Sequence, residues 1–263
     1  MKKLCTSISG CLLALSLFSQ PGSWKQAGKA GEWIGTIQAV EADGKLFTIE
    51  SSGILYQTNA DQGTWQKIGK PEFANTAFMF YANKMIYTVE KSGSLYAVNP
   101  ADGTWKQVGA AGAWKGTIAG AILNNQLYTV ESSGVLYVTN LSDGVWKKIG
   151  KPDFIATRFM VSANNKLYTI ETSGSLYEIN PTDGTWKPVG AAGAWKGTQN
   201  ATVMNNTLYT VETSGALYAT DLSTGTWKQL GKPDFIATRF ITGEMDKLHT
   251  IETSGSLYGV NVK

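Results

Sequence analysis

Short runs of alternating apolar and polar residues, separated by turn-forming residues, follow one another along most of the chain. In one stretch the runs cover residues 117–123, 126–131, 135–140 and 145–149, and they are rich in aromatic and β-branched side chains. Asn, Ser, Asp and Gly cluster between the runs, as expected for turns between strands. No run has a helical period. The pattern therefore predicts an all-β protein built from short strands.

The runs belong to a repeat of about 40 residues, the length at which four-stranded propeller blades recur. Gly-x-Leu-Tyr and Leu-Tyr-Thr-(Ile/Val)-Glu strings each recur along the chain, the second with variants. A third motif, Gly-x-Trp-(Lys/Gln)-x-x-Gly or a close variant, occurs six times, around Trp24, Trp65, Trp105, Trp146, Trp186 and Trp227. Each unit reads as four strands, and we predict that the tryptophans of this third motif pack between neighbouring sheets.

The two ends of the repeat predict a closed ring. The first copy, at residues 23–28, is a lone fourth strand, and the last unit stops after its third strand, at residues 255–263. If the first segment completes the last unit, no sheet edge stays open, whereas an open array would need distinct capping repeats. We therefore predict a six-bladed β-propeller of four-stranded blades, closed by the N-terminal strand.

The connectors between blades come in two kinds that alternate. One kind contains a tryptophan among small residues, and the other follows the pattern Gly-Lys-Pro-(Asp/Glu)-Phe. The aromatic residues of the first kind are Trp33, Trp114 and Trp195, and those of the second kind are Phe73, Phe154 and Phe235. The true period is therefore two blades, and the ring is expected to have approximate three-fold symmetry.

The N-terminus predicts an exported protein. Lys2 and Lys3 are followed by a mostly apolar stretch at residues 8–18, which is too short to span a bilayer, and then by small and polar residues. We assign residues 1–20 to a signal peptide and residues 21–263 to the propeller, and expect a secreted or periplasmic protein without a transmembrane segment. A loose lipoprotein box ends at Cys11, so lipid anchoring there is an alternative, which the apolar residues after this cysteine disfavour.

Composition narrows the chemistry. Both cysteines, Cys5 and Cys11, lie in the leader, so the mature domain has no disulfide, thiolate metal site or cysteine nucleophile. The net charge is +3, and the lysines recur at equivalent repeat positions without forming a basic run. Nucleic acid is therefore not an expected partner. With one histidine and no metal-ligand cluster in the sequence, we also expect no metal, no cofactor and no catalytic residue.

One rim of the ring is expected to carry the candidate site residues, because functional groups collect on loops of a rigid scaffold. The connectors and the turns between second and third strands emerge there. Trp33, Trp114 and Trp195 are either plates for a sugar ring or plugs between blades. In each of the six units a glutamate ends the second strand. This glutamate can either contact a ligand or accept N–H groups of the following turn. These residues are Glu50, Glu90, Glu131, Glu171, Glu212 and Glu252.

Two arginines, one histidine and the connector phenylalanines also stand out on the repeat. Arg158 and Arg239 could hold a carboxylate or a phosphate, but the equivalent residue of the second blade is Ala77, so an arginine site would be incomplete. His249 replaces an aromatic residue that the other blades carry, and we interpret it as a tolerated substitution. The secondary candidates for ligand contact are the two arginines, the connector phenylalanines and the remaining glutamates: Arg158, Arg239, Phe73, Phe154, Phe235, Glu90, Glu171 and Glu252.

The string Trp-Lys-x-(Ile/Val)-Gly, a loop aromatic residue, and the two Leu-Tyr strings together resemble the repeat of tachylectin-type β-propeller lectins, over residues 23–263. Those lectins bind N-acetylated sugars in one pocket per repeat, between blades and without metal. The resemblance implies pockets formed by a connector and the neighbouring Glu-x-Ser-Gly turn, with Trp33, Trp114, Trp195, Glu50, Glu131 and Glu212 as ligand contacts. Because the connectors alternate, three sites are expected rather than six.

A second resemblance leads to a different function. The segment at residues 217–227 is similar to the Ala-x-Asp-x-x-Thr-Gly…Trp motif of quinoprotein-like propellers, a family that includes exported assembly scaffolds and quinone-dependent dehydrogenases. Our main expectation is an exported, non-enzymatic, multivalent carbohydrate-binding module with glycans as partners. A protein-interaction scaffold of the envelope is the alternative, and a glycan-active hydrolase or lyase that uses paired glutamates is the third possibility.

Overall fold

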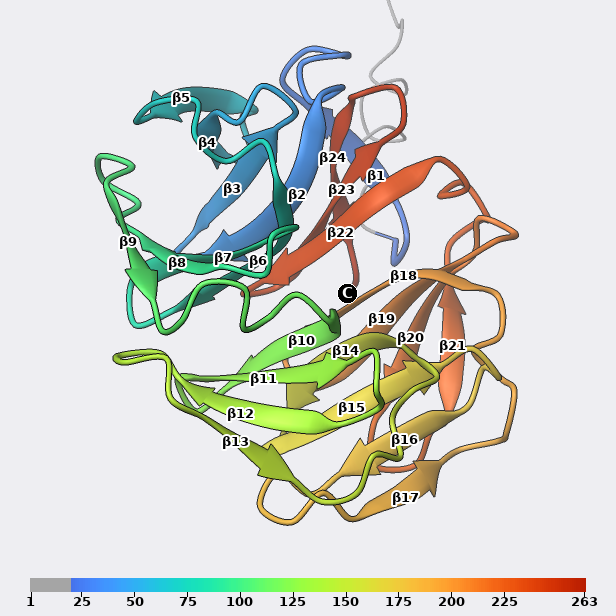
Figure 1. The fold of residues 1–263 in the computed structure, drawn as a ribbon. Coiled ribbons are helices and arrows are strands. Elements are labelled where there is room, and N and C mark those ends of the chain that lie inside the picture. The colour runs from blue at the N-terminus through green and yellow to red at the C-terminus, as the bar shows by residue number, and fades with distance from the viewer. Residues whose placement is uncertain (1–19) are drawn as a thin grey trace, which may run out of the picture.

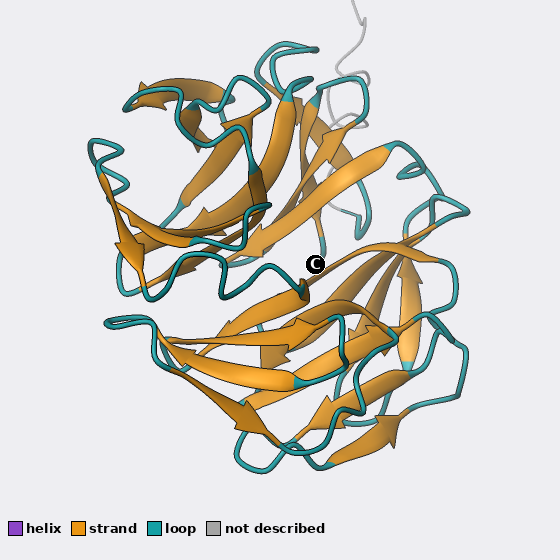
Figure 2. Cartoon of the chain, in the orientation of Figure 1, coloured by secondary structure: helices purple, strands orange, loops and turns teal. Residues whose placement is uncertain are grey.

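The protein, described by a computed structural model over residues 20–263, is a ring of six four-stranded antiparallel sheets, and the described part contains strands and turns but no helix (Figures 1 and 2). The predicted six-bladed β-propeller is therefore confirmed. In each complete blade the chain runs outward from the innermost strand through three hairpins. Residues 1–19, which include most of the predicted signal peptide and the possible lipid anchor at Cys11, lie outside the described residues.

The first three blades follow one another in sequence. Blade 1 consists of β2 (Thr36–Ala42), β3 (Lys45–Glu50), β4 (Leu55–Asn59) and β5 (Thr64–Ile68). Blade 2 consists of β6 (Thr76–Ala82), β7 (Met85–Glu90), β8 (Leu95–Val98) and β9 (Trp105–Val108). Blade 3 consists of β10 (Thr117–Leu123), β11 (Gln126–Glu131), β12 (Leu136–Asn140) and β13 (Trp146–Ile149), so the last two strands begin one residue later than the sequence predicts.

The remaining blades repeat this order, except that the last one takes its outer strand from the start of the chain. Blade 4 consists of β14 (Thr157–Ala163), β15 (Lys166–Glu171), β16 (Leu176–Ile179) and β17 (Trp186–Val189). Blade 5 consists of β18 (Thr198–Met204), β19 (Thr207–Glu212), β20 (Leu217–Asp221) and β21 (Trp227–Leu230). Blade 6 consists of β22 (Thr238–Glu244), β23 (Lys247–Glu252), β24 (Leu257–Asn261) and β1 (Trp24–Ala27).

The two ends of the described chain close the ring, as the repeat predicts. Strand β1 pairs antiparallel with β24, with Trp24 opposite Val260 and Ala27 opposite Leu257. The backbone N–H of Asn261 donates to the Ser23 carbonyl at 2.9 Å, which extends the ladder beyond the strand. On the inner side β2 contacts both β6 and β22. The sheet edge of β24 is thereby covered by a segment more than two hundred residues away in sequence.

The hydrophobic core lies between the blades rather than inside each one. Leucine, isoleucine and valine side chains of the second and third strands are buried, apart from the partly buried Val138, because both faces of each sheet pack against a neighbour. Six hydrophobic clusters result, and each joins two adjacent blades and includes one aromatic residue of the connector between them. The connector aromatics are therefore plugs at the blade interfaces.

The junction between blade 6 and blade 1 carries polar contacts that the equivalent residues of the other blades cannot make. His249 is buried in β23, and its Nδ1 atom lies 2.9 Å from Oε1 of Glu41 in β2. The hydroxyl of Thr242 donates to Glu41 at 3.0 Å, and the Lys247 ammonium lies 2.6 Å from Asp61. His249 is thus not merely a tolerated substitution, since it neighbours a carboxylate that is itself buried.

Candidate functional site

The connector tryptophans lie on the expected rim but inside the protein. Trp33, Trp114 and Trp195 are only 2–3% exposed. Each donates its backbone N–H to the glycine carbonyl of the preceding blade's turn, as Trp114 does to Gly93 at 2.9 Å. The indole of Trp114 also donates to the Thr139 hydroxyl at 3.4 Å. This burial favours the plug over the exposed plate, although one side of each ring still borders a pocket.

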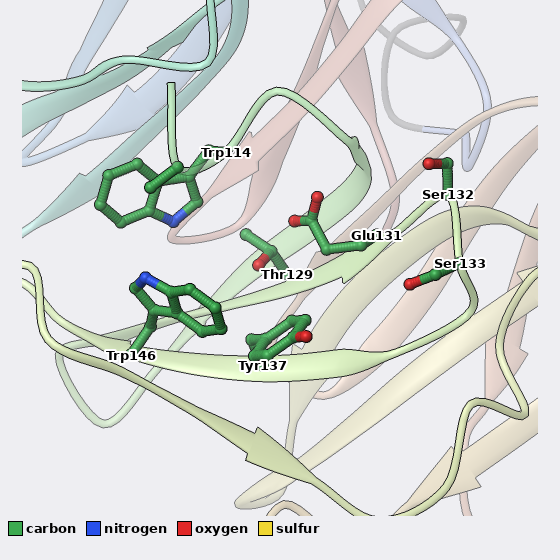
Figure 3. A pocket seen from close by; sticks show the side chains of 8 residues that line it. Trp114, Thr129, Glu131, Ser132, Ser133, Tyr137 and Trp146 are labelled. Atoms are coloured by element: carbon green, nitrogen blue, oxygen red, sulfur yellow. The ribbon is translucent and has the colours of Figure 1, made fainter. Parts of the chain in front are cut away.

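Three equivalent pockets open on this rim, one each in blades 1, 3 and 5, which are the blades that follow a tryptophan connector. We call them the Trp-connector pockets. Their volumes are about 330, 280 and 250 Å³ in blades 1, 3 and 5. In blade 3 the walls include the connector residue Trp114, Tyr137 and Trp146 as aromatic rings, with Glu131 on the opposite side (Figure 3). The equivalent residues in blades 1 and 5 line the other two pockets: Trp33, Glu50, Tyr56 and Trp65, and Trp195, Glu212, Tyr218 and Trp227.

The structure thus brings together the residues that the sequence singles out, namely the connector tryptophan and the glutamate of the same blade. It adds residues that the sequence analysis assigned to the core. The tryptophans of the fourth strands are 45–52% exposed, so the prediction that they pack between sheets is wrong. The reason is their position: the fourth strand is the outer edge of the blade, and only its last residue is buried.

Each fourth-strand tryptophan is held against the tyrosine of the neighbouring third strand. The ring centroids of Tyr137 and Trp146 are 4.5 Å apart at an interplanar angle of 86°, and the other five pairs have similar edge-to-face geometry. Such pairs add about 0.5–1.5 kcal/mol beyond the burial of their area. The exposed indole is therefore an ordered surface element.

The indole N–H of the fourth-strand tryptophan has a protein acceptor beside one connector type and none beside the other. In blades 2, 4 and 6 the acidic residue before the connector phenylalanine accepts the indole N–H, as Glu72 does from Trp105 at 2.9 Å; the other two pairs are Asp153 with Trp186 and Asp234 with Trp24. In blades 3 and 5 this acidic residue is replaced by Ala113 and Ala194, which line the pockets. Among the described residues, the indole N–H groups of Trp65, Trp146 and Trp227 have no protein acceptor. They are free to donate to a ligand.

The glutamate carboxylates at the ends of the second strands accept a threonine hydroxyl rather than the N–H groups of the following turn. The turn N–H of Gly134 donates to the backbone carbonyl of Glu131, whereas the carboxylate accepts the hydroxyl of Thr117 in the first strand at 2.7 Å. The same bond recurs in blades 1, 2, 5 and 6, between Thr36 and Glu50, Thr76 and Glu90, Thr198 and Glu212, and Thr238 and Glu252. Glu171 is the exception, since the hydroxyl of the equivalent Thr157 has no hydrogen-bond partner.

A glycine beside each pocket glutamate leaves its second carboxylate oxygen room. A methyl group on Gly116 would come within 2.7 Å of Oε2 of Glu131, and Gly35 and Gly197 have the same relation to Glu50 and Glu212. The corresponding residues before the threonine in the other blades are Asn75, Ala156 and Ala237. The glycine is thus confined to the blades that have a Trp-connector pocket.

Burial is the main influence on the acidity of the six glutamates. It raises the pKa of Glu50, Glu90, Glu131, Glu171, Glu212 and Glu252 above the ordinary value, and in all but Glu171 threonine hydroxyls partly counteract the shift. Each of these carboxylates is therefore a negative charge held in an environment that disfavours it. A positively charged ligand would relieve this cost.

These shifts predict that the protein is more stable at mildly acidic pH. A carboxyl whose folded-state pKa is raised contributes stability that is present below its unfolded pKa and lost as pH rises through the folded pKa. We expect the Tm to be higher at about pH 5 than at about pH 7.5. This pH interval lies above the ordinary pKa of carboxyl groups and below that of lysine. Thermal unfolding checks this, and the double variant E90Q/E252Q, outside the Trp-connector pockets, should reduce the difference. A Tm that rises from pH 5 to pH 7.5 would contradict it.

The two arginines bind the protein itself. Arg158 in β14 donates to the carbonyls of Lys196 and Thr198, at 3.3 and 2.6 Å, and so fixes the connector of blade 5. Arg239 in β22 donates in the same way to Trp33 and Ile34, in the connector of blade 1. Their charges also lower the pKa of Glu212 and Glu50, against the larger effect of burial. The arginines are therefore neighbours of two pockets rather than an anion clamp.

The connector phenylalanines are core residues. Phe73, Phe154 and Phe235 are each 2% exposed and fill the blade interfaces without contributing to the Trp-connector pockets. Of the other secondary candidates, Glu90 and Glu252 are buried, at 8% exposure. Glu171 lies at the equivalent position of blade 4. The structure therefore brings only half of the predicted glutamates into the three pockets.

The described residues contain no cluster of three or more His, Cys, Asp or Glu side chains arranged to hold a metal ion. Within residues 20–263 there is also no helix of the length and apolarity that crossing a membrane requires. What the pockets do offer is aromatic surface, hydroxyl groups, a free indole donor and the partly buried carboxylate of a glutamate. This set suits reversible binding of a small group.

Comparison with solved structures supports the fold. The chain matches a structural genomics protein of unknown function from Bacteroides thetaiotaomicron VPI-5482 with a TM-score of 0.65 and 13% identity, over 93% of this chain and 73% of that one. It matches virginiamycin B lyase from Staphylococcus aureus with a TM-score of 0.61 and 14% identity, over 92% and 89%. It matches YCF48 in complex with a D1 peptide with a TM-score of 0.57 and 13% identity, over 87% and 78%.

Sequence comparison identifies the family. No curated protein matches the chain. The family model described as outer membrane protein assembly factor BamB matches residues 18–229, which is well over half of the sequence. The second resemblance noted in the sequence, to quinoprotein-like propellers, is thereby supported, whereas a tachylectin-type identity is not. The chain belongs to the BamB family of outer membrane protein assembly factors.

Proposed function

We propose that this protein is a non-enzymatic interaction scaffold of the cell envelope, which holds partner proteins on the rim that carries the Trp-connector pockets. The observation that supports this most strongly is the BamB family match over residues 18–229. The match favours the scaffold over the carbohydrate-binding module as the main function. Export by a signal peptide at residues 1–20 and a periplasmic or secreted location are part of the proposal.

The geometry of the rim agrees with a scaffold. The three pockets have the same kind of lining and are carried by sheets that are locked to one another through the interblade clusters. Three equivalent sites on a rigid support strengthen attachment to a partner that engages several of them, because the second contact forms at a high effective concentration. YCF48, a protein of similar fold, has been solved with a D1 peptide bound, and this agrees with a role in binding proteins or peptides.

The symmetry of the rim also argues against catalysis there. A reaction needs an acid, a base or a nucleophile placed against one substrate. The pocket glutamates instead recur with the same threonine partner in blades 1, 3 and 5, so none of these carboxylates is set apart for such a role. The likeness to virginiamycin B lyase concerns the fold at 14% identity and transfers no catalytic residue. We therefore keep the non-enzymatic proposal.

A carbohydrate-binding module remains the second candidate, because one specific observation favours it. Each Trp-connector pocket places two tryptophans and a tyrosine beside hydroxyl groups and a carboxylate. Aromatic faces with a few polar groups are the usual ingredients of a sugar site. The two candidates differ in the ligand that the same pockets retain, so one set of variants tests both.

The exposed tryptophans provide that test. We expect the triple variant W65A/W146A/W227A to lose capture of its partner proteins from solubilised envelopes of the source cells by about tenfold or more, because avidity multiplies the loss at each site. The matched control is W24A/W105A/W186A, which removes three equally exposed tryptophans from the blades without these pockets. Captured proteins are quantified by mass spectrometry, and both variants are applied to a glycan array.

The outcomes separate the candidates. Loss of the same captured proteins in the pocket variant, with the control unchanged, supports the scaffold. Glycan retention that disappears only in the pocket variant, without any specific protein partner, would replace the scaffold by the carbohydrate-binding module. Equal loss in both variants would show that the pockets are not the contact surface.

A further inference from the structure

We propose that the Trp-connector pockets bind cations, namely the ammonium or guanidinium group of a lysine or arginine on a partner protein, and that the blade 3 pocket binds this group more tightly than the blade 5 pocket. The identity of the partner as a protein rests on the proposed function. The chemistry of the pocket does not, because it is argued from the lining residues alone.

The charge of the pocket lining is the first argument. The residues that line the blade 3 pocket include one carboxylate, Glu131, and no lysine, arginine or histidine; the same holds in blade 5 with Glu212, while blade 1 has two carboxylates, Glu32 and Glu50. One oxygen of Glu131 accepts the Thr117 hydroxyl. A partly buried carboxylate such as Glu131, with no basic side chain in its pocket lining, is best matched by a cationic ligand.

The aromatic walls are the second argument. Trp114, Tyr137 and Trp146 surround the space in front of Glu131 from the other sides (Figure 3). The faces of tryptophan and tyrosine rings attract cations within about 6 Å, most strongly where water is excluded. An ammonium group between these rings and Glu131 would contact several aromatic faces and one carboxylate at once. An anion would find neither a basic side chain nor a helix N-terminus in this lining.

The size of the pockets is consistent with one side-chain head group. Volumes of about 250–330 Å³ lie at or below the lower end of the range for small-molecule sites, about 300–1,000 Å³. They accommodate the end of a lysine or arginine but not a folded segment. The remaining partner surface would lie on the rim around the pocket, where the connectors are exposed.

The difference between blades 3 and 5 is the third argument, because their linings are nearly identical. Both contain alanine, tryptophan, threonine, glutamate, tyrosine and tryptophan at equivalent positions. The blade before blade 5 supplies Arg158, whose positive charge acts on Glu212. The blade before blade 3 has Ala77 at that position. A bound cation is therefore repelled by a guanidinium in blade 5 and not in blade 3.

The test is a titration of the ¹⁵N-labelled protein with Nα-acetyl-lysine N-methylamide at low ionic strength, followed through the indole N–H resonances. We expect the resonances of Trp146 and Trp227 to shift, with an apparent Kd at least about threefold lower for Trp146, because a nearby like charge disfavours binding. The resonances of Trp105 and Trp186, whose indoles donate to Glu72 and Asp153, serve as internal controls and should stay in place.

Two substitutions make the test specific. E131Q keeps an acceptor for Thr117 and should weaken binding at Trp146 by about tenfold while leaving Trp227 unchanged; E90Q, in blade 2, is the matched control and should change neither. A77R introduces the residue that blades 4 and 6 carry, where the guanidinium is accommodated by connector carbonyls. It should raise the Kd at Trp146 to the value at Trp227.

The opposite results are equally clear. N-acetylglucosamine that shifts Trp146 at a concentration at which the lysine derivative has no effect would overturn the proposal in favour of a sugar site. An unchanged Kd in A77R would overturn the ranking of the two pockets. If the lysine derivative binds as expected while E50Q/E131Q/E212Q captures envelope partners normally, the cation site stands and the proposed scaffold does not use it.

Discussion

Replacing Trp114 by alanine is expected to lower the free energy of unfolding by about 3–5 kcal/mol, the range for deletion of a large aromatic side chain from a core. The side chain is 3% exposed and belongs to the cluster that joins blades 2 and 3. Its removal would leave a cavity between two sheets and take the indole donor from Thr139. Urea unfolding followed by far-UV circular dichroism measures the change.

The control for this prediction is Trp146→Ala in the same pocket. Trp146 is 47% exposed and contacts Tyr137 edge to face, so we expect a loss of about 1 kcal/mol, the worth of such a pair. The triple variant W33A/W114A/W195A should not fold, because three such losses approach or exceed the whole stability of a domain, about 5–15 kcal/mol. A cost for Trp114→Ala no larger than that for Trp146→Ala would contradict the plug role.

Removal of residues 20–28 is expected to have a comparably large effect. The deletion takes away the four-residue ladder of β1 with β24, at about 1 kcal/mol for each hydrogen bond, and exposes a strand edge that can pair with another molecule. Ala27 also leaves the cluster that contains Trp33 and Leu257. We expect a shifted unfolding midpoint together with dimers or larger species in size-exclusion chromatography.

A circular permutant separates loss of the strand from loss of chain connectivity. The Asn261 side chain donates to the Gln20 carbonyl at 3.4 Å, so a short linker can join Lys263 to Gln20. New ends between the exposed residues Lys29 and Ala30 would make blade 6 continuous in sequence. This permutant of the 20–263 segment should fold as a monomer with nearly unchanged stability. A deletion variant as stable and monomeric as the permutant would show that β1 is dispensable.

The fold could be predicted from the sequence because every local signal repeats. Strand patterns, turns and the incomplete first and last units all indicate the same closed ring, and only the starts of β12 and β13 differ, by one residue. A repeat does not, however, distinguish a buried position from an exposed one. Trp114 and Trp146 both recur with fixed periods, and the structure buries the first and exposes the second.

The sequence did contain part of the missing information about the site. The buried tryptophans stand in connectors that occur in alternate blades, and the exposed ones stand in the last strand, which has a neighbour on one side alone. A threonine fourteen residues before each glutamate is as regular as the glutamate itself, yet its hydroxyl bond depends on the pairing of β10 with β11 and cannot be read from spacing. The acid that accepts the indole N–H comes from a connector 33 residues away in blades 2 and 4.

The polar junction between blade 6 and blade 1 has a consequence for how the chain folds. β1, β9 and β21 share the sequence Trp-Lys-Gln, so the third strand of one molecule could pair with the wrong fourth strand, from the same chain or from another copy. Such an exchange, or a ring that closes with a blade pair missing, would place buried Glu41 next to a tyrosine in place of His249. The residues equivalent to Glu41 in blades 2 to 5 are Tyr81, Ile122, Ser162 and Val203, which bear no charge. Loss of the contacts of Glu41 with His249 and Thr242 would therefore favour the native closure over rings that are closed with another strand.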